Sequence, residues 1–177
     1  GASAMASYYY LLSSLPLLKT QGEVPMDYET FLSMCKSAVS GGVYQTLETL
    51  TVASDKGPLL SEWASFYRAL SQELTYQRSV KLGRACAVPS DRDAGIVQTV
   101  TAAVNAEDPL TGERILLDLE FHRLDDMIGL HNFDEHALFG YAMKLRLLER
   151  QQIFRHDRGV QSFDGLMAHI RQQISSL

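Results

Sequence analysis

The chain has 177 residues and a formal net charge of -5, with acidic and basic side chains interspersed along it. This balance argues against a nucleic-acid-binding protein, which is usually basic. No apolar run is long enough to cross a bilayer, and the N-terminal apolar stretch lacks the basic flank and cleavage site of a signal peptide. Cys35 and Cys86 lie far apart in no metal or redox spacing, which is typical of reduced thiols in a cytosolic protein. We expect a single domain over residues 5–177, preceded by the cloning remnant Gly1–Ala4.

The first part of the chain predicts short elements. The apolar run Tyr8–Leu18 fits either a buried helix or a strand, because it is too short for its periodicity to decide. Asp27 is placed to cap a helix that ends near Ala38. The glycine pair at 41–42 interrupts the helical pattern, and a shorter helix is expected after it.

A long helix is predicted next, with Pro58 as its first residue and its end near Arg84. Its inward stripe is expected to contain Leu59, Trp63, Phe66, Leu70 and Leu74. The segment Val88–Ser90 is the one plausible hinge in the chain. Asp91 is placed to cap a helix of small residues over 94–106, and small side chains favour close packing against a neighbour.

The pair Asp108-Pro109 combines a capping residue with proline at the first helical position, and the helix that it starts is expected to reach Ile128. A short turn then leads into the next helical pattern. Short connections favour antiparallel neighbours, so the helices on either side of this turn are predicted to form a hairpin.

The stretch Phe133–Gly159 carries the strongest helical pattern in the chain, with Asp134 as its expected N-cap and Gly159 as its expected end. Two adjacent apolar rows predict a wide buried face, and they consist of Leu138, Tyr141, Leu145 and Leu148, and of Phe139, Met143, Leu147 and Phe154. A last helix is expected over 162–174, with Phe163, Leu166, Met167 and Ile170 inward. The sequence thus predicts an all-α fold, a single helical domain of about seven to eight helices with an antiparallel helix hairpin in its second half.

Motifs of catalysis are missing from the sequence: there is no phosphate-binding loop and no nucleophile elbow, so we expect no catalytic residue and no cofactor. The cluster that remains to be weighed surrounds the predicted turn and contains His122, His131 and His136 among several carboxylates. Zinc or iron would accept such ligands. His131 and His136 do not have the spacing that places ligands on one helix face, however. Ordinary polar surface and a metal site therefore both stay open.

Basic residues gather at the ends of two predicted helices. The first group is Arg78, Lys81 and Arg84, and the second contains Arg155 and Arg158. Cations at a helix C-terminus complement the helix dipole, so solvated helix ends would explain them. The alternative interpretation is a surface that binds an acidic partner.

Several short motifs, in their order and spacing, resemble an uncharacterised bacterial family encoded among the genes of V-type ATPases. They begin with Tyr8-Tyr9-Tyr10-Leu11 and Ser14-Leu15-Pro16, and continue with Trp63, Phe66, Leu70, Arg78, Lys81-Leu82-Gly83, Asp108-Pro109-Leu110, Glu113, His131, Phe133-Asp134, Tyr141, Lys144-Leu145, Leu148-Glu149-Arg150 and Gly159. The second half is also similar, more distantly, to the V-type ATPase C subunit, which is the d subunit of eukaryotes. That subunit is a helical, non-catalytic funnel between the rotating shaft and the membrane ring.

The resemblance implies a non-catalytic structural or assembly component of a bacterial V-type ATPase, without a nucleotide site on this chain. Its partners would be the central-stalk and membrane-ring subunits, and it would be cytoplasmic and peripheral to the inner membrane through those partners. The basic ends near Arg84 and Arg158 would meet an acidic shaft or ring loop, and such a contact is sensitive to salt. The alternatives are a small metal-dependent enzyme that uses the His122, His131 and His136 region, and a generic helical protein-interaction adaptor.

Overall fold

The computed structural model describes the backbone of residues 2–175 and the side chains of residues 7–159, 170, 171 and 173–175. The described residues form seven helices and no strand, which confirms the predicted all-α fold. These helices are α1 (Ala2–Ser14), α2 (Tyr28–Cys35), α3 (Gly41–Thr49), α4 (Leu60–Lys81), α5 (Ala94–Val104), α6 (Pro109–Ile128) and α7 (Glu135–Ser175). Among the described residues, no helix combines the length and apolar composition that crossing a membrane requires.

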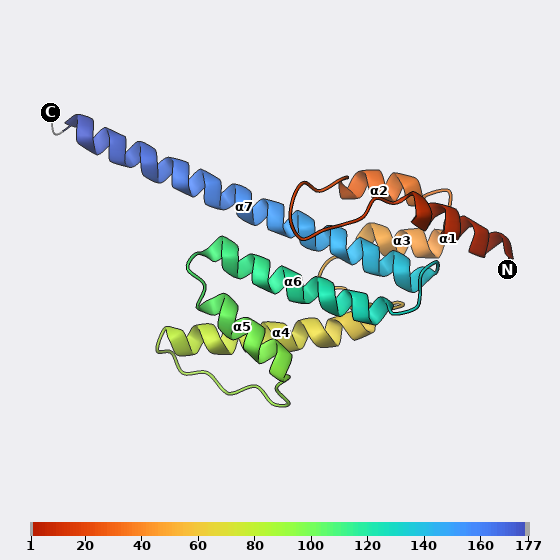
Figure 1. Cartoon of the computed structure of the whole chain (residues 1–177), viewed down its shortest axis with the longest axis horizontal. Helices are drawn as coiled ribbons and strands as arrows, with labels where there is room; N and C mark the ends of the chain where they lie inside the picture. The colour runs from red at the N-terminus through yellow and green to blue at the C-terminus, as the bar shows by residue number, and fades with distance from the viewer. Residues whose placement is uncertain (1, 176–177) are drawn as a thin grey trace.

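Helix α7 is the axis of the molecule (Figure 1). Helices α1, α2 and α3 lie on one side of its first half, and α4, α5 and α6 lie on the other. Its second half projects away from the body and carries the C-terminus. The helix therefore serves as a core element at one end and as an arm at the other.

The first half of α7 is a core helix because two apolar rows cover a wide arc of its surface. The buried members of these rows are Leu138, Phe139, Met143, Leu145, Leu147 and Leu148, and none is more than 2% exposed. Burying one side chain of this size contributes about 1.5–3 kcal/mol. The predicted wide face of this helix is therefore confirmed. Of the residues predicted to face inward over 162–174, Ile170 is instead exposed, at 37%, and the side chains of Phe163, Leu166 and Met167 lie outside those that the structure describes.

Helices α6 and α7 run antiparallel, as the pairing of their side chains shows. Lys144 Nζ lies 2.5 Å from Asp125 Oδ1. Further toward the C-terminus of α7, Arg150 Nη2 lies 2.6 Å from Glu120 Oε1 and 3.5 Å from Glu113 Oε1. Residue numbers thus rise along α7 while they fall along α6, which is the predicted hairpin. The connection Gly129–Asp134 closes it.

Helix α5 packs against α4 and α6 at close range because its residues are small. A Cβ atom built on Gly112 of α6 would lie only 2.7 Å from the carbonyl oxygen of Ala103. Glycine at this position therefore lets the two backbones approach. The prediction that the small residues over 94–106 permit close packing agrees with this geometry.

Three predicted helix ends are wrong. Pro58 does not start α4: it lies in a turn before Leu59, which has a φ of 67°, and the helix begins at Leu60. Asp91 has a φ of 51° and does not cap α5, whose cap is Asp93, which accepts a hydrogen bond from the Ile96 amide at 3.0 Å. Gly159 does not end α7, because its φ is not positive and the helix continues to Ser175. The separate last helix over 162–174 is consequently part of α7.

The N-terminal apolar run is partly helical and only partly buried: Leu11 and Leu18 lie in the core, whereas Tyr9, Tyr10 and Leu17 are exposed. Residues 8–14 of the run lie in α1, which settles the choice between helix and strand for them.

Trp63 is fully buried, and its Nε1–H donates to the carbonyl of Val52 at 2.8 Å. The tryptophan is therefore a satisfied core residue, and its stripe on α4 is the predicted one.

Candidate partner-binding groove

A groove of about 410 Å³ opens where the arm of α7 leaves the body. We call it the α4–α7 groove. Its apolar floor consists of Leu74, Leu82, Ala103, Val104, Leu116 and Phe154. Three cations stand at its edge, Arg78 and Lys81 from α4 and Arg158 from α7, together with the carboxylate of Glu113 from α6. The groove is thus apolar inside and predominantly cationic at its rim.

The cations reach this rim because α4 ends here with two basic residues in its last turn. Lys81 Nζ donates to the carbonyl of Val104 at 2.6 Å, at the C-terminus of α5, where a cation complements the helix dipole. Arg158 lies against the ring of Phe154, with 5.4 Å between its guanidinium carbon and the ring centroid. Among the described side chains, neither Arg78 nor Arg158 has an ion-pair partner, so both are free to meet an anion.

A smaller cavity beside the groove contains an ion pair between a buried carboxylate and a partly exposed guanidinium. This cavity of about 160 Å³ shares Leu74, Arg78, Glu113 and Leu116 with the groove and is bounded by Glu120 and Arg150. The Glu120 side chain is only 1% exposed, and its Oε1 accepts from Arg150 at 2.6 Å. Within the described part of the chain, Glu120 Oε2 and Arg150 Nε have no hydrogen-bond partner.

Burial dominates the electrostatics of Glu120. It raises the pKa of Glu120 above its ordinary value, although the Arg150 guanidinium beside it acts in the opposite direction. The two atoms without a partner are themselves buried, so they add to the free-energy cost of burying this pair and not to the binding surface of the groove.

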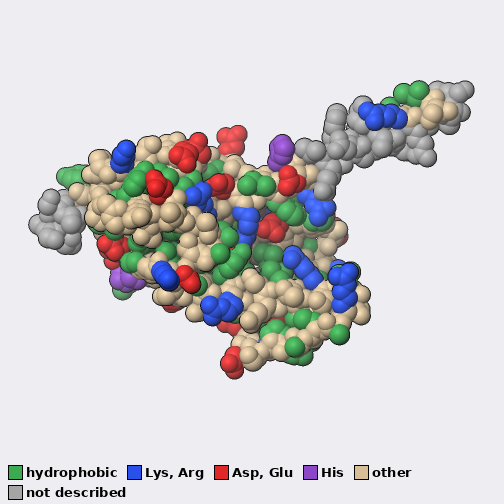
Figure 2. All heavy atoms as spheres, turned by 180° about the vertical axis from the view of Figure 1, so that it is seen from behind, with side chains coloured by type: hydrophobic (Ala, Val, Ile, Leu, Met, Phe, Trp, Pro, Cys, Tyr) green, Lys and Arg blue, Asp and Glu red, His purple; other side chains and the backbone are tan. Residues whose placement is uncertain are grey.

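Three of the five predicted partner-binding residues line the groove, and two do not. Arg78, Lys81 and Arg158 meet at its rim. Arg84 follows Gly83, whose φ of 71° ends α4, and Arg155 lies exposed on α7 outside the groove lining. Figure 2 shows Lys and Arg side chains gathered on the body beside the root of the projecting helix.

The sequence interpretation predicted Leu74 and Phe154 as inward-facing residues, but it did not assign Glu113 of the groove or Glu120 of the neighbouring cavity to a site. Glu113 and Glu120 lie seven residues apart on α6, at the spacing of its buried stripe, and this was the signal that could have revealed them. Carboxylates on an apolar stripe require a cation from a neighbouring helix, and Arg150 supplies it.

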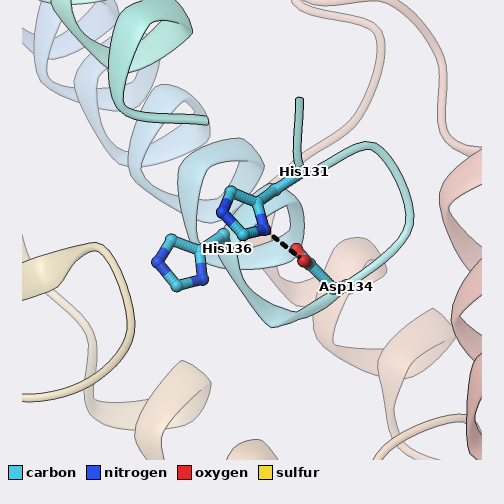
Figure 3. A group of neighbouring side chains, drawn as sticks. All are labelled: His131, Asp134 and His136. Carbon is cyan, nitrogen blue, oxygen red and sulfur yellow. Dashed lines mark hydrogen bonds and ion pairs between the residues drawn. The ribbon is translucent and has the colours of Figure 1, made fainter. Parts of the chain in front are cut away.

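The predicted metal candidates divide into one group and one separate residue. His131 and His136 lie side by side, with 4.3 Å between ring centroids and 14° between ring planes (Figure 3). His131 Nδ1 lies 2.5 Å from Asp134 Oδ2. His122 is not part of this group; it is exposed on α6, and its Nε2 lies 3.8 Å from Asp126 Oδ2.

Asp134 has the capping role that the sequence predicts for it. Its Oδ1 accepts a hydrogen bond from the Ala137 amide at 3.2 Å in the first turn of α7. Partial burial opposes ionisation of this carboxyl, but the hydrogen bonds from His131 and Ala137 outweigh it and hold its pKa below the usual value. The cap thus holds a carboxylate beside the two imidazoles.

Comparison with protein-family models, with curated proteins and with solved structures finds no match to this chain.

Proposed function

We propose that this protein is a non-catalytic structural or assembly component of a bacterial V-type ATPase, cytoplasmic and peripheral to the membrane. In this role it binds an acidic, amphipathic segment of a central-stalk subunit in the α4–α7 groove. The observation that carries the proposal is the groove itself, with an apolar floor and a cationic rim beside the projecting arm of α7. The family is suggested by the order and spacing of the sequence motifs described above.

The charge of the rim favours an acidic occupant. Arg78 and Arg158 have no ion-pair partner among the described side chains, and Glu113 on the same lining already faces Arg150. Complementary charge steers a partner into place and selects it against basic competitors. The apolar floor favours the hydrophobic face of a helix, which inserts side chains at i, i+3, i+4 and i+7.

The arm of α7 supports a role in assembly. The helix has 41 residues and is therefore about 60 Å long. Its exposed apolar side chains include Ile153 at 58% and Ile174 at 64% exposure. A partner that covers these exposed apolar side chains would remove them from water and so stabilise the arm. A long helix anchored in a core at one end is also a stiff element for coupling two bodies.

The test is co-purification of the protein with the V-type ATPase from native cell extract at low and at high salt. The proposal predicts that it travels with the central-stalk subunits at low salt. It also predicts partial loss near 1 M salt, where the screening length falls to about 3 Å and the cationic rim is screened. An ATPase that elutes without the protein under both conditions would exclude the role, whereas retention that is independent of salt would exclude the groove as the main contact.

A further inference from the structure

The connection between α6 and α7 places three potential metal ligands together. His131 and Asp134 lie in this connection, and His136 is the second residue of α7. One potential ligand atom from each lies within 4.8 Å of the others. Two of the three side chains are half-buried and one is exposed, so solvent reaches the group.

We infer that His131, Asp134 and His136 bind one divalent transition-metal ion, with zinc or nickel as the expected species. The inference is independent of the proposed role in an ATPase. Two imidazoles and one carboxylate form a ligand set that suits these ions, whereas magnesium and calcium prefer oxygen ligands alone. Three protein ligands leave at least one coordination position for water.

The geometry requires only a small adjustment of side chains. Tetrahedral ligands at zinc bond lengths lie about 3.4 Å apart, so the largest separation of 4.8 Å must close by a little over an ångström. Imidazole lone pairs lie in the ring plane, and the two rings are nearly parallel. One ring must therefore turn about its terminal torsion, which exposure of His131 permits.

Asp134 is already oriented for this role. Its Oδ1 is held by the Ala137 amide, and its Oδ2 faces His131 (Figure 3). In the absence of the ion this hydrogen bond holds the His131 ring beside Asp134, and an ion bound by both residues would take the place of the shared proton. The positive end of α7 weakens cation binding here, but the carboxylate offsets it.

The bound ion would hold the connection between α6 and α7 to the first turn of α7, where α1 also contacts this region. Phe133 lies between the ligands His131 and Asp134 in the sequence. Its ring centroid is 4.8 Å from that of Tyr9 in α1. Binding to the folded state alone stabilises a protein, so we expect the ion to raise the unfolding temperature of this chain.

The test is isothermal titration calorimetry of the untagged chain with zinc chloride and with nickel chloride, with magnesium chloride as a control. We expect one ion per chain and a rise in unfolding temperature with zinc. His131→Ala and His136→Ala should each raise Kd about tenfold or more. The matched control is His122→Ala, which removes an exposed histidine beside a carboxylate on the same hairpin and should leave Kd unchanged.

Asp134→Asn separates coordination from folding, because asparagine also caps helices but offers no anionic oxygen. This variant should unfold at the temperature of the metal-free wild type and bind zinc about tenfold more weakly. Absence of a binding isotherm with zinc, together with an unfolding temperature that zinc does not change, would overturn the inference. A loss of affinity in His122→Ala equal to that in His131→Ala would overturn it as well.

Discussion

Replacement of Arg150 by methionine tests the ion pair in the smaller cavity beside the groove. Methionine keeps much of the apolar stem of arginine but removes the charge that faces Glu120, whose side chain is 1% exposed. Removal of one partner of a buried pair costs about 3–5 kcal/mol, because the other charge stays buried without compensation. For a chain of this length each kcal/mol lowers the unfolding temperature by about 2–4 °C, so we expect a loss of roughly 6–20 °C at pH 7.

The loss should depend on pH in a defined direction. Burial raises the pKa of Glu120 above the ordinary value of 4.5, so the folded state binds this proton more tightly than the unfolded state does. The unfavourable contribution of the ionised carboxylate is therefore absent well below pH 4.5 and grows as the pH rises through the folded-state pKa. Removal of Arg150 raises that pKa further. The difference between Arg150→Met and wild type should shrink as the pH falls from 7 to 5.

Urea denaturation at pH 7 and at pH 5 measures both effects. Arg155→Met is the matched control, since it removes an exposed arginine of the same helix, and it should change the free energy of unfolding by less than about 0.5 kcal/mol. The double variant Glu120→Leu/Arg150→Met should recover most of the loss, because apolar replacement of both partners is often neutral. The reasoning is refuted if Arg150→Met costs no more than Arg155→Met, or if the double variant is less stable than the single one.

Three further predictions concern helix packing and helix ends, all measured as free energies of unfolding in urea. Gly112→Ala should lose about 1–3 kcal/mol, because the new Cβ would lie 2.7 Å from a backbone oxygen of α5; an unchanged stability would contradict the close α5–α6 contact. Gly159→Ala should gain about 0.5–1 kcal/mol, because α7 continues through this residue with nothing within 4 Å, and a loss would mean that the helix ends there. Asp93→Ala should lose about 1 kcal/mol, because it removes the side chain that caps α5. Asp91→Asn should change stability by less than about 0.5 kcal/mol. A larger loss in the Asp91 variant than in the Asp93 variant would mean that Asp91 is the cap.

Local chemistry predicted those helix starts at which one side chain decides the outcome. Asp27 and Asp108 cap α2 and α6 as expected, because an acceptor side chain two or three residues before a free amide needs no tertiary context. The sequence predicted the wrong first residue for α4 because Leu59 has a positive φ. Leucine rarely adopts this backbone conformation, so only tertiary packing accounts for it. Leu59 is 3% exposed, so burial of its side chain compensates for this backbone conformation.

The composition of the groove could be predicted only in part. Basic residues at helix ends are visible in the sequence, but their convergence depends on where two helices meet in space. Arg78 and Arg158 meet because α6 and α7 form a hairpin beside α4, whereas the positive φ of Gly83 ends α4 and separates Arg84 from the groove lining. The ion pair of Glu120 with Arg150 joins residues 30 positions apart, which no local pattern indicates.

The histidine group shows a different limit of sequence reasoning. Spacings of three or four residues identify ligands that share one helix face. His131 precedes α7, so the helical rule does not apply to its separation from His136. Residues 132–134 turn the chain into α7 between the two histidines, and the two rings come to lie 4.3 Å apart. The V-type ATPase relationship stays a prediction from sequence motifs.

The most direct test of the groove is binding of charge-reversed variants to isolated central-stalk subunits. Arg78→Glu/Arg158→Glu reverses the two rim cations that have no ion-pair partner among the described side chains. Arg84→Glu/Arg155→Glu makes the same change of charge just after α4 and on α7, at positions outside the groove lining. We predict that the first variant loses binding at low salt and that the second retains it. Equal loss in both would indicate a general effect of charge, and retention in both would contradict the groove as the binding site.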